Sequence, residues 1–306
     1  MSTVVDRILR DIGDQELLGK LLALPRSDLN SLLLELFSGL AGKTTPADVL
    51  KAYQGNRFST PSEAEPSKFY SLEAELTGAA QRAGMKTVLL SPSAPLGSCS
   101  SFGCVNQNNV VSAVRGTETL SDPSNMLAII IADKLRNDME SNRSPLHYVA
   151  TARVVRAQAF SGKGFYSHFG VFCIVSSGKD SGSYACEKEL LIKQLKYYKE
   201  MFLNKYDATI SIALRKRGGY ADGTGFFTRI TSVIGTVLPD VPVSLETTQE
   251  ENKYYKGVNF KIYMEKNGDK FELGDGGYVD WISQMTGSKK ERCLISGIGL
   301  DRLLLL

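Results

Sequence analysis

The stretch SGIGLDRLLLL, residues 296–306, carries the pattern that decides the fold. It starts as an apolar β-strand, passes through Gly297 and Gly299, and runs into a leucine-rich helix. Two glycines between a strand and a helix allow a flat ligand to approach the backbone closely. Arg302 in the first helical turn suits a polyanion such as a triphosphate, or stacking on a base. A plain strand-to-helix turn with a surface arginine has the same pattern, and in either case we expect Leu303–Leu306 to be buried.

A second basic segment, RVVRAQAFSGKGFYSHFGVF (153–172), predicts two antiparallel strands joined by the loop SGKG (161–164). An arginine at the position of Arg156, facing a concave surface, is costly unless it is paired or binds an anion. Lys163, between two glycines, can reach toward phosphates. Taken alone, the segment is also compatible with a structural hairpin that has a basic tip.

The composition indicates an ordinary globular chain of 306 residues, with 42% hydrophobic residues, 23% charged residues and a net charge of +3. No apolar run approaches the length of about 18 residues that a membrane span needs. The first residues contain acids and no apolar core of a secretory signal. Five cysteines, an odd number, favour reduced thiols and a cytoplasmic location. Cys99 and Cys104 form the one close pair, so we expect no metal cage made by the protein.

The chain divides at a polar, proline-bearing stretch. Residues 1–57 predict helices, with Ser27-Asp28 and Thr45-Pro46 as helix starts. FSTPSEAEPS (58–67) predicts a linker. Residues 68–306 then predict one core domain.

Within 68–306 the pattern predicts an α+β fold, a mostly antiparallel sheet flanked by helices. Several strands follow one another through hairpin-like connections, which is typical of antiparallel pairing. The helices are expected at 71–84, 121–138 and 186–203, and the strands at 85–92, 108–120, 147–160, 165–178, 208–214, 257–265, 270–274 and 292–299.

Taken together and in order, these segments resemble the class II aminoacyl-tRNA synthetases. Residues 153–172 resemble motif 2 of that family, and GDGGYVDWISQ (274–284) followed by SGIGLDRLLLL resembles motif 3 with its preceding glycine turn. The closest resemblance is to the histidyl-tRNA synthetase branch, which includes the regulatory subunit of ATP phosphoribosyltransferase. KYYKGVNFKIYME (253–265) is similar to the paired-tyrosine strand of that branch, and helix 71–84 with its following strand resembles the dimer-forming motif 1.

The resemblance implies roles for individual residues. Arg156 and Arg302 would be catalytic: Arg156 would hold the α-phosphate of ATP and polarise the substrate carboxylate, and Arg302 would lie against the adenine and γ-phosphate. Mg²⁺ would accompany ATP. The nucleotide would be bound by Arg156, Gln158, Lys163, Phe169, Gly297, Gly299 and Arg302. The amino-acid substrate would be bound by Thr117, Glu118, Thr119, Tyr254, Tyr255, Gly276 and Gly277.

The sequence also departs from the family pattern. Motif 2 normally reads Arg-x-Glu, and here Gln158 replaces the glutamate, which removes its negative charge. Histidyl enzymes have a catalytic arginine where this chain has Glu250, and another where it has Tyr278. The printed chain stops at Leu306, where synthetases continue into an anticodon-binding domain. The resemblance therefore does not imply histidine as the substrate.

Three functions remain open from the sequence. The first is ATP-dependent adenylation of an amino acid or a related small carboxylate, by a synthetase-like core that lacks an anticodon-binding domain. The second is a catalytically silent paralogue that senses an amino acid or regulates another enzyme. The third is a tRNA ligase that uses the helices of residues 1–57, which the lack of a basic face there disfavours. In each case we expect a homodimer, formed through about residues 71–100, and no membrane contact.

Overall fold

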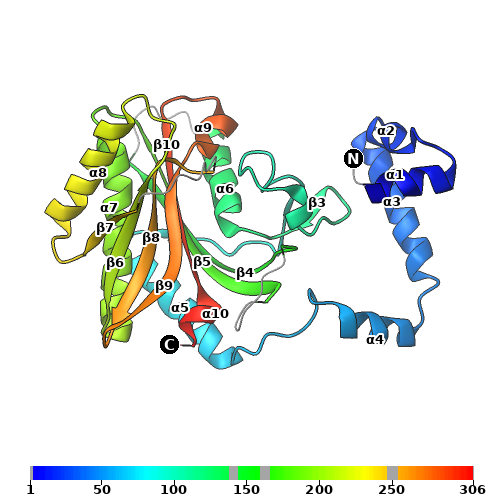
Figure 1. Cartoon of the computed structure of the whole chain (residues 1–306), viewed down its shortest axis with the longest axis horizontal. Helices are drawn as coiled ribbons and strands as arrows, with labels where there is room; N and C mark the ends of the chain where they lie inside the picture. Colours follow the sequence, from blue (N-terminus) through cyan, green and yellow to red (C-terminus); the bar gives the residue numbers. More distant parts are fainter. Residues whose placement is uncertain (1–2, 138–143, 159–165, 247–253, 306) are drawn as a thin grey trace.

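One mixed sheet organises the chain in the computed structural model (Figure 1). Across the residues that the structure describes, which are 3–137, 144–158, 166–246 and 254–305, eight strands form this sheet. They are β1 (Lys86–Thr87), β4 (Leu146–Val155), β5 (His168–Lys179), β6 (Thr209–Lys216), β7 (Val243–Glu246), β8 (Lys256–Lys266), β9 (Asp269–Val279) and β10 (Glu291–Gly299). Their order is β1-β4-β5-β10-β9-β8-β6-β7. Only the edge strands β1 and β7 pair in parallel, each with its single neighbour, so the predicted mostly antiparallel sheet is confirmed.

Helices cover both faces of this sheet, because the strands send apolar side chains alternately to one face and the other. Phe172 and Ile174 of β5 join the core beneath α5 (Pro66–Arg82), α7 (Ala185–Tyr206) and α8 (Gly223–Val237). Cys173 and Val175 join the core beneath α6 (Pro123–Asn137) and α9 (Trp281–Thr286). Figure 1 shows α7 and α8 on one side of the sheet and α6 and α9 on the other. The predicted α+β class is thereby confirmed.

Four helices precede the sheet, as predicted for residues 1–57: α1 (Thr3–Ile12), α2 (Leu17–Leu22), α3 (Arg26–Ala41) and α4 (Pro46–Gly55). In Figure 1 they lie beside the sheet and its helices, in blue. Thr45 caps α4 in a reciprocal capping box with Asp48, as the Thr-Pro pair predicts. The predicted start at Ser27-Asp28 is wrong, because α3 begins at Arg26 after an extended Pro25.

Two predicted strands are much shorter than expected. Residues 85–92 contribute only β1, and residues 108–120 contain the short 3₁₀ helix η1 (Gln107–Asn109) and β3 (Thr117–Thr119). β3 pairs with β2 (Ser93–Pro95) in a separate two-stranded sheet. Arg115 and Gly116 both have φ of 65°, and a turn in this left-handed region cannot continue a strand.

The closing helix α10 (Leu300–Leu303) is short, and the leucines in and after it divide between core and surface. Leu300 and Leu303 are buried, but Leu305 is 71% exposed. The prediction of a wholly buried leucine face is therefore wrong at Leu305, and Leu306 lies outside the described residues. Within the described ranges, we found no helix with the length and apolar character required to traverse a bilayer.

Candidate functional site

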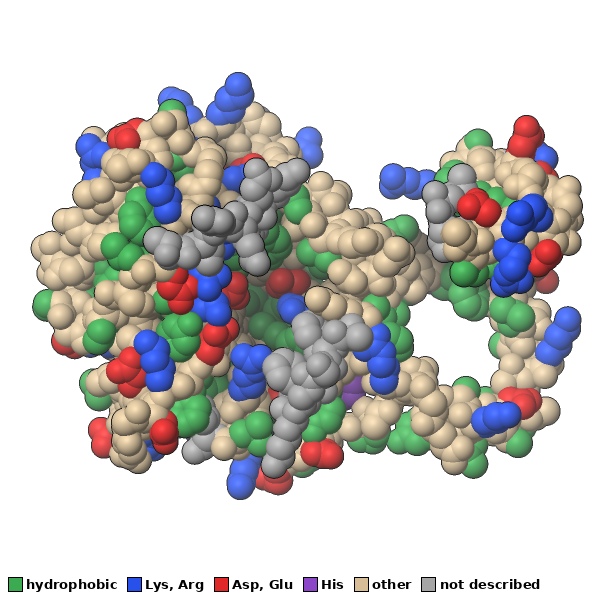
Figure 2. Space-filling view, viewed as in Figure 1, with side chains coloured by type: hydrophobic (Ala, Val, Ile, Leu, Met, Phe, Trp, Pro, Cys, Tyr) green, Lys and Arg blue, Asp and Glu red, His purple; other side chains and the backbone are tan. Residues whose placement is uncertain are grey.

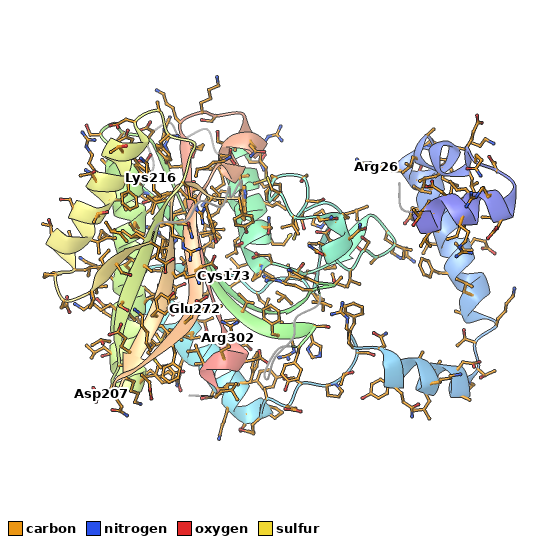
Figure 3. The ribbon with its side chains drawn as sticks, viewed as in Figure 1. Arg26, Cys173, Asp207, Lys216, Glu272 and Arg302 are labelled. Carbon is orange, nitrogen blue, oxygen red and sulfur yellow. The ribbon has the colours of Figure 1, made fainter. Side chains whose placement is uncertain are left out.

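A cavity of about 540 Å³ opens on the α6 face of the sheet. Figure 2 shows a hollow near the middle of this view, with both acidic and basic side chains around it. In Figure 3, Cys173, Glu272 and Arg302 lie near this place, far from Arg26 of α3. The cavity is lined mainly by β5, β9, β10, α10 and the residues that follow β4. Of the residues predicted to bind ligands, it brings together Arg156, Gln158, Phe169, Tyr254, Tyr255, Gly297, Gly299 and Arg302.

Strand β10 forms the floor of the cavity, and at Gly297 and Gly299 no side chain projects from it. Gly297 is paired with Cys173 on one side and with Asp275 on the other. A Cβ added at Gly297 would meet nothing closer than 3.6 Å, and one at Gly299 nothing closer than 3.8 Å. Neither packing nor backbone conformation therefore requires glycine at these positions. A side chain at either position would occupy the cavity.

One wall of the cavity is formed by Arg156, one residue beyond the end of β4. Its Nε donates a hydrogen bond to the carbonyl oxygen of Ser121 at 3.1 Å, and its guanidinium lies 5.1 Å from the centre of the Phe169 ring. Nη2 is 3.8 Å from Oδ2 of Asp122. Asp122 uses its other oxygen to accept hydrogen bonds from the backbone and hydroxyl of Ser124 at the start of α6. Arg156 is thus held at the cavity without a close ion pair.

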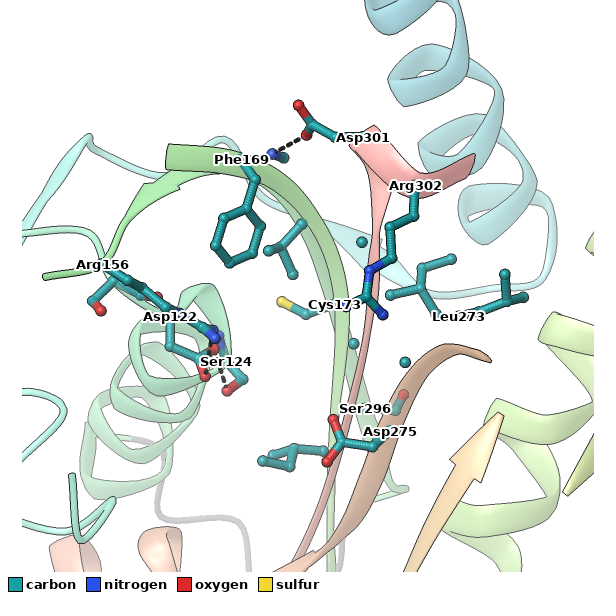
Figure 4. Close-up of a pocket in the computed structure, with 18 of the residues that line it drawn as sticks. Asp122, Ser124, Arg156, Phe169, Cys173, Leu273, Asp275, Ser296, Asp301 and Arg302 are labelled. Atoms are coloured by element: carbon teal, nitrogen blue, oxygen red, sulfur yellow. Dashed lines mark hydrogen bonds and ion pairs between the residues drawn. The ribbon is translucent and has the colours of Figure 1, made fainter. Parts of the chain in front are cut away.

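The opposite wall contains Arg302, which is exposed toward solvent and lines the same cavity. Figure 4 shows Arg156 and Arg302 reaching in from different sides, with Phe169 and Cys173 between them. The helix that carries Arg302 is anchored by its neighbour Asp301, which accepts a hydrogen bond from the backbone N–H of Gly170 at 2.6 Å. Asp301 also lies 3.3 Å from Nη2 of Arg153. This anchor was not predicted from the sequence, although its signal, an acid beside the arginine, is present.

A third wall is formed by β9 and the paired tyrosines. Tyr255 donates a hydrogen bond from its hydroxyl to Oδ2 of Asp275 at 2.9 Å. Figure 4 shows the carboxyl group of Asp275 pointing into the cavity near Ser296. Asp275 is exposed at the cavity, and desolvation by the neighbouring protein raises its pKa, assisted by the negative charge of Asp122. Asp275 was also missed from the sequence.

Three residues predicted to bind the substrate, Thr117, Glu118 and Thr119, do not line this cavity. Glu118 is completely buried and accepts hydrogen bonds from the backbone N–H of Gly97 at 2.8 Å and of Cys99 at 3.3 Å. It also accepts from the hydroxyl of Ser98 and the amide of Gln107. Four donors within the chain occupy its two oxygens, so this carboxylate holds a turn together.

Gly276 and Gly277 likewise do not line the cavity. Their lack of a side chain makes room for neighbouring aromatic rings. A Cβ at Gly276 would come within 2.5 Å of the Phe260 ring, and one at Gly277 within 2.5 Å of the Tyr255 ring. Tyr278 lies on the other face of the sheet, where its hydroxyl donates a hydrogen bond to the carbonyl oxygen of Glu187 at 2.7 Å. It is therefore no counterpart of an arginine in the cavity. Lys163 and Glu250 lie outside the described residues.

The sequence predicts a linker before α5 but not its contacts: residues of this segment bond to those that follow β4 and to those at the start of β5. Arg57 donates hydrogen bonds to the carbonyl oxygens of Ala157 and Gln158 and to the hydroxyl of Ser167. The imidazole of His168 lies 2.5 Å from the carbonyl oxygen of Thr60. We call residues 57–63 the strap, because they contact both residues 157–158, which follow β4, and residues 167–168, where β5 begins.

Two cysteines also line the cavity. Burial raises the pKa of the Cys99 thiol to about 12 and that of the Cys173 thiol well above its usual range. Both thiols are therefore neutral near pH 7, and they contribute apolar surface. Among the described residues, no group of three or more His, Cys, Asp or Glu is arranged to hold a metal ion.

No protein-family profile matches the sequence, and no curated protein matches it either. Solved structures do match. The chain resembles the apo histidyl-tRNA synthetase of S. aureus at a TM-score of 0.59 and 12% identity, over 82% of this chain and 68% of that one. It resembles an ATP phosphoribosyltransferase regulatory subunit/histidyl-tRNA synthetase from Bacillus halodurans at 0.60 and 12% identity, over 81% of both chains.

A putative threonyl-tRNA synthetase from Aeropyrum pernix is similar at a TM-score of 0.61 and 11% identity, over 77% of this chain and 58% of the other. Identities this low establish the fold alone. The chain therefore has a class II synthetase-like fold, as the resemblance of its motifs predicts.

Proposed function

We propose that the cavity binds ATP and activates a carboxylate, of an amino acid or a related small acid, as its adenylate. The observation that carries this proposal is the convergence of Arg156 and Arg302 on one cavity whose floor is opened by Gly297 and Gly299. Two guanidinium groups in a confined space fit a polyphosphate, because Arg binds phosphate oxygens with paired hydrogen bonds.

The Phe169 ring provides a surface for the adenine. Because the guanidinium of Arg156 lies over that ring, a base stacked nearby would place its α-phosphate within reach of Arg156. Arg302, on the opposite wall, would close on the other side of the nucleotide. Gln158 retains an amide that can hydrogen-bond an adenine edge.

The reaction would then proceed by attack of a carboxylate oxygen on the α-phosphorus. A new C–O–P bond forms, the bond to the bridging oxygen breaks, and pyrophosphate leaves with that electron pair. Arg156 would neutralise charge that develops on the α-phosphoryl oxygens, and holding the two reactants in line would supply much of the rate. Mg²⁺, carried by the ATP phosphates, would offset their remaining charge.

A second candidate is a regulatory subunit that binds the amino acid without activating it. The specific observation in its favour is that Tyr278, where related enzymes have arginine, lies on the far face of the sheet. The likeness to a regulatory subunit over 81% of both chains agrees with this candidate. A tRNA ligase is a third candidate, which no contact among the described residues favours.

We also propose that the chain forms a homodimer, through about residues 71–100. Helix 71–84 with its following strand resembles the dimer-forming motif 1, and in this region Leu89 is 96% exposed and Leu96 is 53% exposed. Apolar side chains this exposed mark interaction surfaces when they cluster. Light scattering at micromolar concentration should give twice the mass of one chain, and the mass of a single chain would contradict the proposal.

The direct test of adenylation is ATP–pyrophosphate exchange over a panel of amino acids and small carboxylic acids. The wild-type chain should catalyse exchange with at least one of them. Arg156→Ala should lower the rate about 100- to 1,000-fold, the effect of removing a charge-stabilising donor. Arg229→Ala, on the exposed face of α8, is the matched control and should leave the rate unchanged. Amino-acid binding without any exchange would favour the regulatory candidate.

A further inference from the structure

The cavity contains four carboxylates, and their partners differ. Glu272 lies 2.7 Å from Nζ of Lys261, and Asp301 lies 3.3 Å from Nη2 of Arg153. Asp122 caps α6 and lies 3.8 Å from Arg156. Each of these three therefore has a cation within ion-pair distance.

Asp275 is the exception. In the described part of the chain no Lys or Arg lies within 4.0 Å of its carboxyl group, and its one hydrogen bond comes from the Tyr255 hydroxyl. That bond occupies Oδ2 and orients the carboxyl group, which points into the cavity (Figure 4). Asp275 is exposed at the cavity, so its oriented carboxyl group, with no cation beside it, is available to a positively charged ligand.

We propose that Asp275 binds a positively charged nitrogen on the side chain of the substrate, so that the chain selects amino acids with a cationic side chain, such as diamino acids. This inference rests on the proposed function, which places the substrate carboxylate at Arg156. A substrate with a carboxylate at one end and an ammonium at the other complements a cavity with arginines on two walls and Asp275 on a third.

The arrangement of the sheet separates the two ends of such a substrate. Asp275 and Cys173 flank Gly297 in one row across three strands, so their backbones lie about two strand spacings, roughly 10 Å, apart. Nothing projects from Gly297 between them. An aliphatic chain can therefore cross the floor over the buried, neutral Cys173 and Gly297 and reach Asp275 with its terminal ammonium.

The paired tyrosines complete this subsite. The Tyr255 ring packs on Gly277, and Tyr254 meets Tyr255 at a ring distance of 4.8 Å and Trp281 at 5.3 Å. These rigid aromatic contacts hold the hydroxyl that orients Asp275. Aromatic faces also favour a nearby ammonium group. The two tyrosines were predicted as substrate-binding residues, and here they act with Asp275 as one unit.

The test is calorimetric binding of single amino acids in the absence of ATP, which needs no catalysis. The probes are L-lysine and L-ornithine, each compared with its uncharged counterpart, L-norleucine or L-norvaline. We expect the cationic member of a pair to bind about 10- to 100-fold more tightly, the value of a charged hydrogen bond. Asp275→Asn should abolish that preference, whereas Asp269→Asn, an exposed acid on the same strand, should retain it.

Equal binding of the charged and uncharged probes would overturn the inference, and so would a preference that survives in Asp275→Asn or the absence of binding by every probe. Thermal unfolding of each variant verifies that it is folded. Tyr255→Phe gives a second reading, since loss of the orienting hydroxyl should weaken the preference without abolishing it. ATP–pyrophosphate exchange is measured separately, so failure of the cation subsite is distinguishable from failure of adenylation.

Discussion

Two carboxylates on different parts of the molecule differ in how many hydrogen-bond partners the chain itself provides. Glu118, in the β2–β3 sheet, is completely buried and accepts four hydrogen bonds from the chain. Asp275, on β9, faces the cavity and accepts one. From sequence alone the first was predicted to bind substrate and the second was overlooked. Residue type and motif therefore matter less than the number of partners already present.

The pKa values of the same two carboxyl groups are shifted in opposite directions. Burial acts to raise the pKa of Glu118, but the hydrogen bonds from Ser98, Gln107, Gly97 and Cys99 together outweigh it and lower that pKa. At Asp275 desolvation by the surrounding protein outweighs the one hydrogen bond from Tyr255, and the pKa is raised. Hydrogen bonds from the chain therefore favour the charged form of Glu118 more strongly than that of Asp275.

The largest expected effect is on the stability of the fold, when Glu118 is removed. Glu118→Ala leaves two backbone N–H groups and two side-chain donors without their acceptor, and we expect it to lower the free energy of unfolding by about 3–5 kcal/mol. Denaturant unfolding measures this loss. A variant with near-normal stability would show that the turn does not depend on Glu118, and the contrast with Asp275 would fail.

The same comparison can be made between two arginines, Arg57 of the strap and Arg156 of the cavity. Arg57 is satisfied by three acceptors of the chain, whereas Arg156 faces the cavity. If Arg57 positions the hairpin, Arg57→Ala should raise the KM for ATP about threefold to tenfold, with a smaller change in kcat, because one or two hydrogen bonds are lost. Arg57→Lys should raise the KM for ATP less than Arg57→Ala does. A change in kcat alone would contradict a positioning role.

The pH dependence of stability should have opposite signs at the two carboxylates. The lowered pKa of Glu118 means that its contribution is present above the unfolded value, near 4, and is lost as pH falls through its folded pKa. Glu118→Gln should therefore flatten the acid side of the stability profile. Equal acid slopes for the wild type and this variant would contradict the hydrogen-bond account.

Asp275 should show the smallest effect on stability and the reverse sign. Its raised pKa means that the folded chain takes up a proton more readily than the unfolded one, so its contribution falls as pH rises from the unfolded value through the folded pKa. Asp275→Asn should leave stability at pH 7 equal to the wild type or slightly higher, as is common when a ligand-binding group is removed. Thermal unfolding at pH 4 and pH 7 measures both values, and a clear loss at pH 7 would assign Asp275 a structural role.

Much of the fold could be predicted, because long strands and helices show their periodicity locally. The helix over 123–137 and the strands through Phe172 and Ile295 follow directly from alternating apolar residues and capping signals. The short elements could not be predicted. Whether residues 85–92 form a strand depends on a neighbour, and β1 pairs with β4 for only two residues.

The site was predictable where a motif fixes the backbone, and not where a partner decides the role. The glycines and arginines of the two segments line one cavity, because β4 and β10 both pair with β5, one on each side of it. The function of Glu118 depends on Gly97, Ser98 and Gln107, which approach it through a turn. The orientation of Asp275 depends on Tyr255, the residue immediately before β8. Such contacts are long-range, and no local pattern encodes them.

The central claim, that the cavity over β10 is a nucleotide site, is tested most directly by calorimetric titration of ATP with Mg²⁺ into wild type and Gly297→Val. A Cβ fits at position 297, so the variant should fold, but its methyl groups would occupy the cavity floor. Gly235→Ala, at a helical glycine with open space around it, is the control. We predict saturable binding by the wild type and the control, and at least a tenfold loss in Gly297→Val, equivalent to about 1.4 kcal/mol. Equal affinity in Gly297→Val, or no binding by the wild type, would contradict the account.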